Sequence, residues 1–179
     1  MNGTFNRALR SVLGVTLGLA LGLVVTAIAG ESPWTVLTIL AKSAFGSLDD
    51  FAMTLFYATP LIFTGLSVAI AFHAGLFNIG AEGQLTFGAL SAAAVGMLFP
   101  SVPGPFAPLL GVLAAFCGGA VWGFLPGWLR ARSGSHEVIT TIMLNFVAAG
   151  LASWVTLFVL RNTETQNPET KPIGAEYLL

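Results

Sequence analysis

Polar side chains gather in one short stretch between two long apolar runs. Residues 73–84 read His-Ala-Gly-Leu-Phe-Asn-Ile-Gly-Ala-Glu-Gly-Gln and include Asn78, Glu82 and Gln84. Amides and a carboxylate form hydrogen bonds, either with the protein backbone or with a polar solute. Three glycines in the same stretch weaken any continuous helix. We therefore expect a broken or re-entrant segment here, with polar groups facing a pathway.

A second polar cluster opens a later apolar run. Glu137, Thr141 and Asn145 recur every fourth residue, which places them on one face of a helix. An amide inside an apolar helix must face protein or water, because burying it without a partner is costly. The two clusters together predict substrate-pathway residues, namely Asn78, Glu82, Gln84, Thr141 and Asn145.

A structural interpretation stands beside the functional one. Asn78 can cap the helix that follows it, and Glu82 then lies in the positive end of its macrodipole. Ser135 can cap the later helix in the same way. Asn145 can form a hydrogen bond between helices. The sequence alone leaves both interpretations open.

Residues for covalent chemistry are sparse. His73 and His136 each stand alone, without a second histidine or a cysteine at ligand spacing. Cys117 is the single cysteine and lies in an apolar run, where a packing role is expected. We expect no catalytic residue, no metal site and no cofactor.

The composition predicts the environment that surrounds these polar clusters. Apolar residues make up 55% of the 179, and charged residues only 8%, against roughly 25% in soluble domains. A chain so poor in charge is expected to lie in lipid. The net charge of −1 gives no sign of a basic surface for binding nucleic acid.

The apolar runs predict an all-α membrane protein with about five transmembrane helices. Basic residues beside the span ends favour a cytoplasmic N-terminus and an external tail over residues 161–179. The first run also resembles a secretory signal, but it is longer than an ordinary signal core, so an uncleaved helix is favoured. Residues 30–50 are too polar to span and are expected at the outer interface. The expected spans are residues 12–29, 51–72, 79–99, 106–128 and 138–160.

Two glycine ridges predict close helix packing. Small residues at every fourth position form a flat strip that lets helix backbones approach in lipid. One ridge lies in the first span and the other in the fourth; they are Gly14, Gly18 and Gly22, and Gly119, Gly123 and Gly127.

Three stretches carry a family resemblance. Phe72–Gln84, followed by Glu137–Asn145, resembles the permease subunits of bacterial ATP-binding cassette (ABC) importers. The branch it resembles most imports nucleosides and simple sugars, within the larger ribose and branched-chain amino acid permease family. The tail 167–173, Asn-Pro-Glu-Thr-Lys-Pro-Ile, is similar to that branch's external loop. The similarity covers about residues 51–179.

The resemblance implies a multi-pass protein of the bacterial inner (plasma) membrane that provides a translocation pathway for a nucleoside or simple sugar. Family permeases are about twice as long, so residues 1–179 resemble the N-terminal half of a permease transmembrane domain. The implied partners are an ABC ATPase subunit, an extracytoplasmic substrate-binding protein, and a second permease subunit or a C-terminal half.

ATP hydrolysis is expected in the partner subunit, because no lysine here follows a phosphate-binding glycine loop. Two alternatives remain at this point. One is a permease for another small polar solute, such as a branched-chain amino acid. The other is a structural membrane protein with no pathway.

Overall fold

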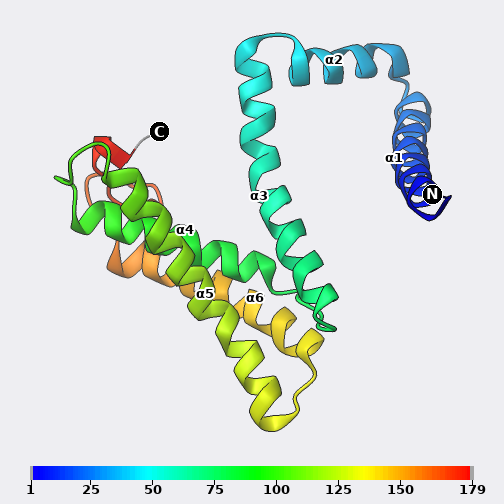
Figure 1. Cartoon of the computed structure of the whole chain (residues 1–179). Coiled ribbons are helices and arrows are strands. Elements are labelled where there is room, and N and C mark those ends of the chain that lie inside the picture. The colour runs from blue at the N-terminus through cyan, green and yellow to red at the C-terminus, as the bar shows by residue number, and fades with distance from the viewer. Residues whose placement is uncertain (1, 178–179) are drawn as a thin grey trace. The chain divides into compact units, whose positions relative to one another are not determined.

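The structure is a computed structural model that describes residues 2–177, with side chains from residue 9 onward. Within that range it consists of helices and connecting segments, and its β-structure is one isolated bridge between Arg161 and Thr170. This confirms the all-α fold class. The helices, shown in Figure 1, are α1 Asn2–Ile28, α2 Pro33–Phe45, α3 Leu48–His73, α4 Ala81–Leu98, α5 Ala107–Ser133, α6 Glu137–Trp154, the π-helix η1 Val155–Val159 and the 3₁₀-helix η2 Ala175–Tyr177.

Four stretches of the described chain are long and apolar enough to cross a membrane. They are Leu9–Ile28, Leu48–His73, Ala107–Ser133 and Glu137–Val159. The other expected span, residues 79–99, forms α4 but is not among these four. Its first turn contains Glu82 and Gln84, and its 18 residues reach only about 27 Å, short of a hydrocarbon core of about 30 Å.

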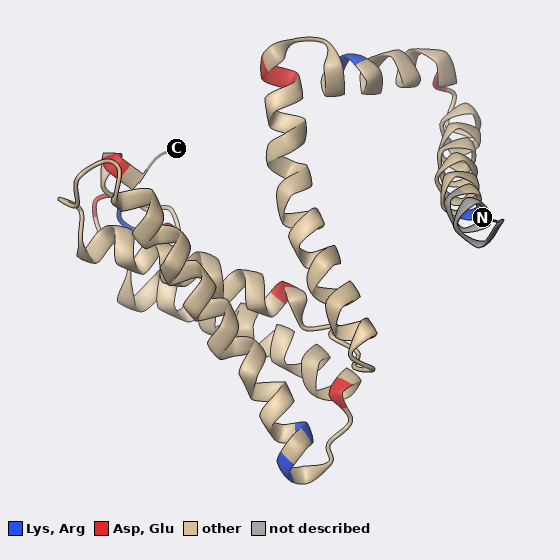
Figure 2. Ribbon diagram, viewed as in Figure 1, with Lys and Arg blue, Asp and Glu red and all other residues tan. Residues whose placement is uncertain are grey.

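Charged residues lie near helix ends, as Figure 2 shows by its blue and red segments. Asp49 and Asp50 occupy the first turn of α3, whereas Arg130 and Arg132 occupy the last turn of α5. This order suits the helix macrodipole and leaves the middle of each helix apolar. The side chain of Arg7, which contributed to the expected orientation, lies outside the described residues, as do residues 178–179 of the expected tail.

The chain divides into two compact units, Met1–Thr59 and Pro60–Leu179, and the boundary falls within α3. In the first unit, Ser32 caps α2 by accepting a hydrogen bond from the Thr35 amide (3.4 Å). The hydroxyl of Ser47 accepts from the Asp50 amide (3.0 Å) and donates to the Asp50 carboxylate (2.6 Å). These caps explain why the polar connection between the first two spans breaks into a separate short helix.

The two glycine ridges differ in their surroundings. Within the first unit, a Cβ placed on any glycine of the α1 ridge meets no described atom within 4 Å. On α5, a Cβ on Gly119 would lie 3.2 Å from the backbone carbonyl oxygen of Gln84. A Cβ on Gly123 would lie 3.2 Å from the side-chain nitrogen of Gln84. Gly127 has no described neighbour at that range, because it lies beyond the start of α4.

In the second unit, α4 and α5 pack closely along glycines on both helices. A Cβ on Gly88 of α4 would lie 2.9 Å from the Ala115 carbonyl, and one on Gly118 of α5 would lie 2.8 Å from the Phe87 carbonyl. Phe87 also stacks on Trp122, with ring centroids 3.7 Å apart. Gly118 and Gly88, which the ridge pattern did not single out, therefore mark the closest backbone approach in this pair.

The tail folds back on the end of α4. The Gly174 amide donates to the Gly96 carbonyl (3.2 Å), and the Tyr177 hydroxyl donates to the Phe99 carbonyl (3.0 Å). Before that contact, residues 160–162 pair with 169–171 through the Lys171 amide and the Leu160 carbonyl (3.0 Å). The tail is thus held at one end of the α4–α6 bundle by backbone hydrogen bonds and by the Tyr177 hydroxyl.

Candidate functional site

A cavity of about 190 Å³ opens where five segments of the second unit converge. These are the end of α3, the non-helical residues 74–80, the start of α4, the end of α5 and the start of α6. The segment 74–80 is the break expected between α3 and α4. The cavity is lined by Ala71, Leu76, Phe77, Asn78, Gln84, Gly123, Pro126, Gly127, Arg130, Glu137 and Thr141.

Asn78 and Gln84 form a reciprocal amide pair on the cavity wall. The Asn78 amide nitrogen donates to the Gln84 side-chain oxygen (3.1 Å), and the Gln84 amide nitrogen donates to the Asn78 oxygen (3.1 Å). Ser67 of α3 joins them, accepting from Asn78 (2.9 Å) and lying 3.3 Å from the Gln84 oxygen. This network links α3, the broken segment and α4.

The expected cap at Asn78 is wrong. The N-cap of α4 is Gly80, which has no side chain, and the Asn78 oxygen instead accepts from the Gly80 amide (3.1 Å). Asn78 lies two residues before that cap and stabilises the turn entering the helix. The free amides of the first turn must therefore find partners elsewhere.

Asn145 supplies one such partner from another helix. Its side-chain oxygen accepts from the Gly83 amide (2.9 Å), at the third position of α4, and its nitrogen donates to the Ile79 carbonyl (2.9 Å). The interhelical hydrogen bond weighed in the sequence analysis is present, and it doubles as a helix cap. Such bonds in membrane proteins contribute about 0.6–2 kcal/mol each.

The close approach at Gly83 makes this cap possible. A Cβ there would lie 2.8 Å from the Trp122 indole nitrogen and 2.9 Å from the Asn145 oxygen. Trp122 is only 8% exposed, and its indole nitrogen has no hydrogen-bond partner among the described residues. Only glycine leaves room for both side chains against the first turn of α4.

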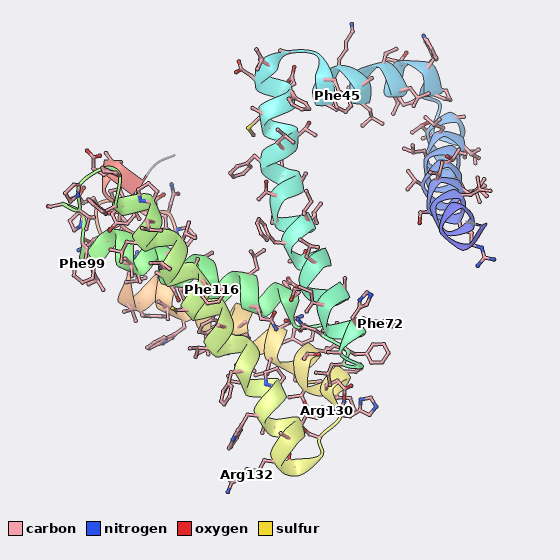
Figure 3. The ribbon with its side chains drawn as sticks, viewed as in Figure 1. Phe45, Phe72, Phe99, Phe116, Arg130 and Arg132 are labelled. Carbon is pink, nitrogen blue, oxygen red and sulfur yellow. The ribbon has the colours of Figure 1, made fainter. Side chains whose placement is uncertain are left out.

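Glu137 and Arg130 close the turn between α5 and α6 with an ion pair. The Glu137 side chain is 11% exposed and that of Arg130 is 41% exposed, so the pair is partly shielded from water. Figure 3 labels Arg130 and Arg132 at this end of α5. The two charged side chains that line the cavity therefore neutralise each other.

Thr141 is buried, and its hydroxyl donates to the Glu137 carbonyl of its own helix (2.7 Å). A Cβ on Gly80 would lie 3.1 Å from the Thr141 Cβ, so Thr141 packs against the entry to α4. Thr141 thus lines the cavity mainly through its carbon atoms. Thr141 and Asn145 thus meet the start of α4 from α6, whereas Glu137 turns to Arg130 of α5.

Residues 51–179 match the model of the family described as branched-chain amino acid transport system / permease component. The chain belongs to this permease family. The match begins within α3 and includes every residue that lines the cavity.

Several members of the permease family are similar to this chain. The guanosine ABC transporter permease protein NupP of Bacillus subtilis is 40% identical over 149 residues, 83% of this chain and 42% of that protein. The nucleoside ABC transporter permease protein NupB of Lactococcus lactis is 39% identical over 147 residues, 82% of this chain and 40% of that protein.

A glucose ABC transporter permease protein of Haloferax volcanii is 40% identical over 146 residues, 80% of this chain and 38% of that protein. The chain thus spans about two fifths of the length of the curated relatives it matches. No solved structure matches it.

Two further sequence-based expectations for this permease-family chain differ from its structure. Glu82 does not line the cavity with Asn78 and Gln84: it is exposed, because a one-residue step along α4 turns it away from Gly83 and the α6 contact. Ser135 does not cap α6. The N-cap is His136, and the buried Ser135 hydroxyl has no partner among the described residues.

Ser67 is one of the site residues that sequence reasoning missed, with Arg130 and Trp122. Hydroxyls in apolar helices usually bond to a carbonyl of their own helix, as Thr64 does to the Pro60 carbonyl (2.8 Å). Nothing in the sequence distinguishes Ser67 from such residues. Among the described residues, no three His, Cys, Asp or Glu side chains are placed to hold a metal ion.

Proposed function

We propose that this chain forms part of the transmembrane permease of an ABC importer and provides part of the pathway for a nucleoside. Family membership and the names of two relatives support this assignment. The pathway residues are Asn78 and Gln84 on the cavity wall, with Thr141 packing beside them. Asn145 positions the broken segment from outside the cavity. Glu82, on the exposed side of α4, is the fifth residue that we assign to the pathway.

The observation that carries the choice of substrate is the balance of charge around the cavity. Its polar lining consists of amides, a hydroxyl and one ion pair, with no unpaired charge. A zwitterionic amino acid would need a separate partner for its ammonium and its carboxylate. A nucleoside or simple sugar needs only neutral donors and acceptors, which amides supply.

The partners follow from the same assignment. A separate ATPase subunit hydrolyses ATP, and an external substrate-binding protein delivers the solute. The second half of the pathway comes from a C-terminal half or a second permease subunit. The whole assembly lies in the bacterial inner membrane, with the N-terminus of this chain in the cytoplasm.

The test is uptake of tritiated guanosine into proteoliposomes that contain the complete permease, the ATPase and the binding protein. Excess unlabelled adenosine should compete, whereas leucine should not. Competition by glucose alone would show that the substrate is a sugar, as the name of the Haloferax volcanii relative suggests for that protein. An assembled complex that hydrolyses ATP but takes up none of these solutes would refute the proposed pathway.

A matched pair of variants tests the role of the amides. Gln84→Leu removes one partner of the amide pair and should reduce uptake at least ten-fold at equal protein level. Ser153→Ala removes a hydroxyl that bonds only to the Ala149 carbonyl of its own helix (2.9 Å), and should leave uptake unchanged. Equal uptake by both variants would place the pathway elsewhere.

The orientation has its own test. A reporter fused after Arg132 should report the cytoplasm, and one fused after Thr165 the periplasm. Arg132 precedes the apolar stretch Glu137–Val159, and Thr165 follows it, so a single crossing separates them. Reporters on the same side would show that this apolar stretch does not cross the membrane.

A further inference from the structure

A second, larger cavity lies at the opposite end of the bundle from the amide pair. It has a volume of about 720 Å³ and opens between the end of α4, η1 and the tail. Figure 3 labels Phe99 at this end of α4. The cavity is lined by Met97, Leu98, Pro100, Leu157, Phe158, Val159, Leu160, Arg161, Thr163, Lys171 and Pro172.

One part of this lining is apolar and belongs to the end of a membrane span. Leu157, Phe158 and Val159 are the last turn of the stretch Glu137–Val159. Phe158 is 73% exposed, and Leu98 across the cavity is 70% exposed. Side chains of this kind at the end of a span are in the position to contact lipid chains.

The other part of the lining is cationic. Arg161 follows the span directly, and Lys171 is brought beside it by the backbone pairing of residues 160–162 with 169–171. No acidic residue lines the cavity, and within the described part of the chain neither cation has an ion pair. The nearby Glu169 carboxylate does not line the cavity and accepts hydrogen bonds from Thr165 (2.5 Å) and Asn162 (3.3 Å).

We propose that this cavity binds an anionic phospholipid. The phosphate group lies between Arg161 and Lys171, and an acyl chain runs along Leu157 and Phe158. Two cations at the end of a span lie at the depth of the headgroups, where basic side chains attract anionic lipids. A free phosphate ion would use the cations but leave the apolar wall without a role, whereas a phospholipid uses both. The proposal needs only that the chain is a membrane protein, and does not depend on the substrate.

Native mass spectrometry of the detergent-purified chain tests this, with equal amounts of phosphatidylglycerol and phosphatidylcholine. The chain should retain one phosphatidylglycerol in preference. Each cation is expected to contribute about 5-fold and the two together about 30-fold, from the usual attraction per basic residue. Equal retention of the two lipids would overturn the proposal.

Variants locate the lipid. The double variant R161Q/K171Q should lose the preference, whereas R161K/K171R, which keeps both charges, should retain it. R132Q, at the opposite end of α5, is the matched control and should behave as the wild type. Helicity measured by circular dichroism should be the same for all, since both cavity cations are exposed. Retention of the preference in R161Q/K171Q would overturn the proposal.

Two further measurements separate the possible ligands. Phe158→Ser should weaken retention of both lipids, because it shortens the apolar wall without changing charge. Inorganic phosphate at 10 mM should not displace phosphatidylglycerol. Displacement by phosphate would reassign the cavity to a free anion and overturn the lipid proposal.

Discussion

The two ends of α4 are held in different ways. At its start, side chains make the attachments: Asn145 from α6 bonds to both sides of the helix entry, and Gln84 pairs with Asn78. At its end, a backbone bond from the Gly174 amide to the Gly96 carbonyl is joined by only one side-chain bond, from the Tyr177 hydroxyl to the Phe99 carbonyl. Side-chain attachment depends on particular residues, whereas backbone attachment depends only on close approach. The start of α4 should therefore tolerate far fewer substitutions than its end.

The largest effect is expected at Gly83. Gly83→Ala places a Cβ 2.8 Å from the Trp122 indole nitrogen and 2.9 Å from the Asn145 oxygen, so it should destabilise the purified chain by about 1–3 kcal/mol. Unfolding by SDS titration in mixed micelles measures this. Gly150→Ala on α6 meets no described atom within 4 Å and is the matched control, expected to be neutral or stabilising. Similar curves for the two variants would mean that α4 is not held against Trp122.

The next largest effect concerns the hydrogen bonds that cap α4. Asn145→Leu removes both bonds and leaves the Gly83 amide unpaired, which should cost about 1–2 kcal/mol. Asn145→Asp keeps the acceptor for Gly83 but loses the donor to Ile79, so it should fall between Asn145→Leu and the wild type. The same SDS titration ranks the three proteins, and uptake by the assembled complex should fall in the same order. A wild-type curve for Asn145→Leu would contradict the capping role.

A smaller effect is expected at the other end of α4. Gly96→Ala brings a Cβ 3.0 Å from the Ile173 side chain, and the tail can yield by a few tenths of an ångström. The cost should be below about 1 kcal/mol and confined to the tail. Limited proteolysis should show faster cleavage within residues 161–177, and adding Ile173→Ala should restore the wild-type rate. Global unfolding at the level of Gly83→Ala would remove the contrast between the two ends.

The smallest effect is expected for Glu82→Gln. The exposed carboxylate interacts with the first turn of α4 only through the macrodipole, so its loss should cost a few tenths of a kcal/mol. Uptake distinguishes the two roles weighed for this residue. Near-normal uptake fits the macrodipole role, whereas a large loss with normal insertion assigns Glu82 to the pathway.

The long apolar runs and the composition were enough to predict the helical class, and the three glycines among polar residues predicted the break before α4. Residue spacing also placed Glu137, Thr141 and Asn145 on one face, because helical periodicity is a local property. The partners of those residues were not predictable. Asn145 bonds to Gly83, 62 residues away, and a single sequence contains no signal for contacts at that distance.

The capping predictions failed for a related reason. Local rules favour a polar residue just before a helix, so Asn78 and Ser135 were natural candidates. In the structure, the start of α4 is satisfied by a tertiary contact, and Asn78 is free to pair with Gln84. The resemblance of the two motifs to permeases indicated the correct family, but not which of their residues meet each other.

The capping of α4 by Asn145 has a consequence for how the chain is made. The first turn of α4 carries polar side chains, and the Gly83 amide lacks its partner until Asn145 is synthesised 62 residues after Gly83. At about 5–20 residues per second this takes roughly 3–12 s. Because unpaired amides are costly in hydrocarbon, we expect α4 to wait at the membrane surface and insert together with α5 and α6. This segment would then insert when its interhelical contacts form, and not when its own residues are synthesised.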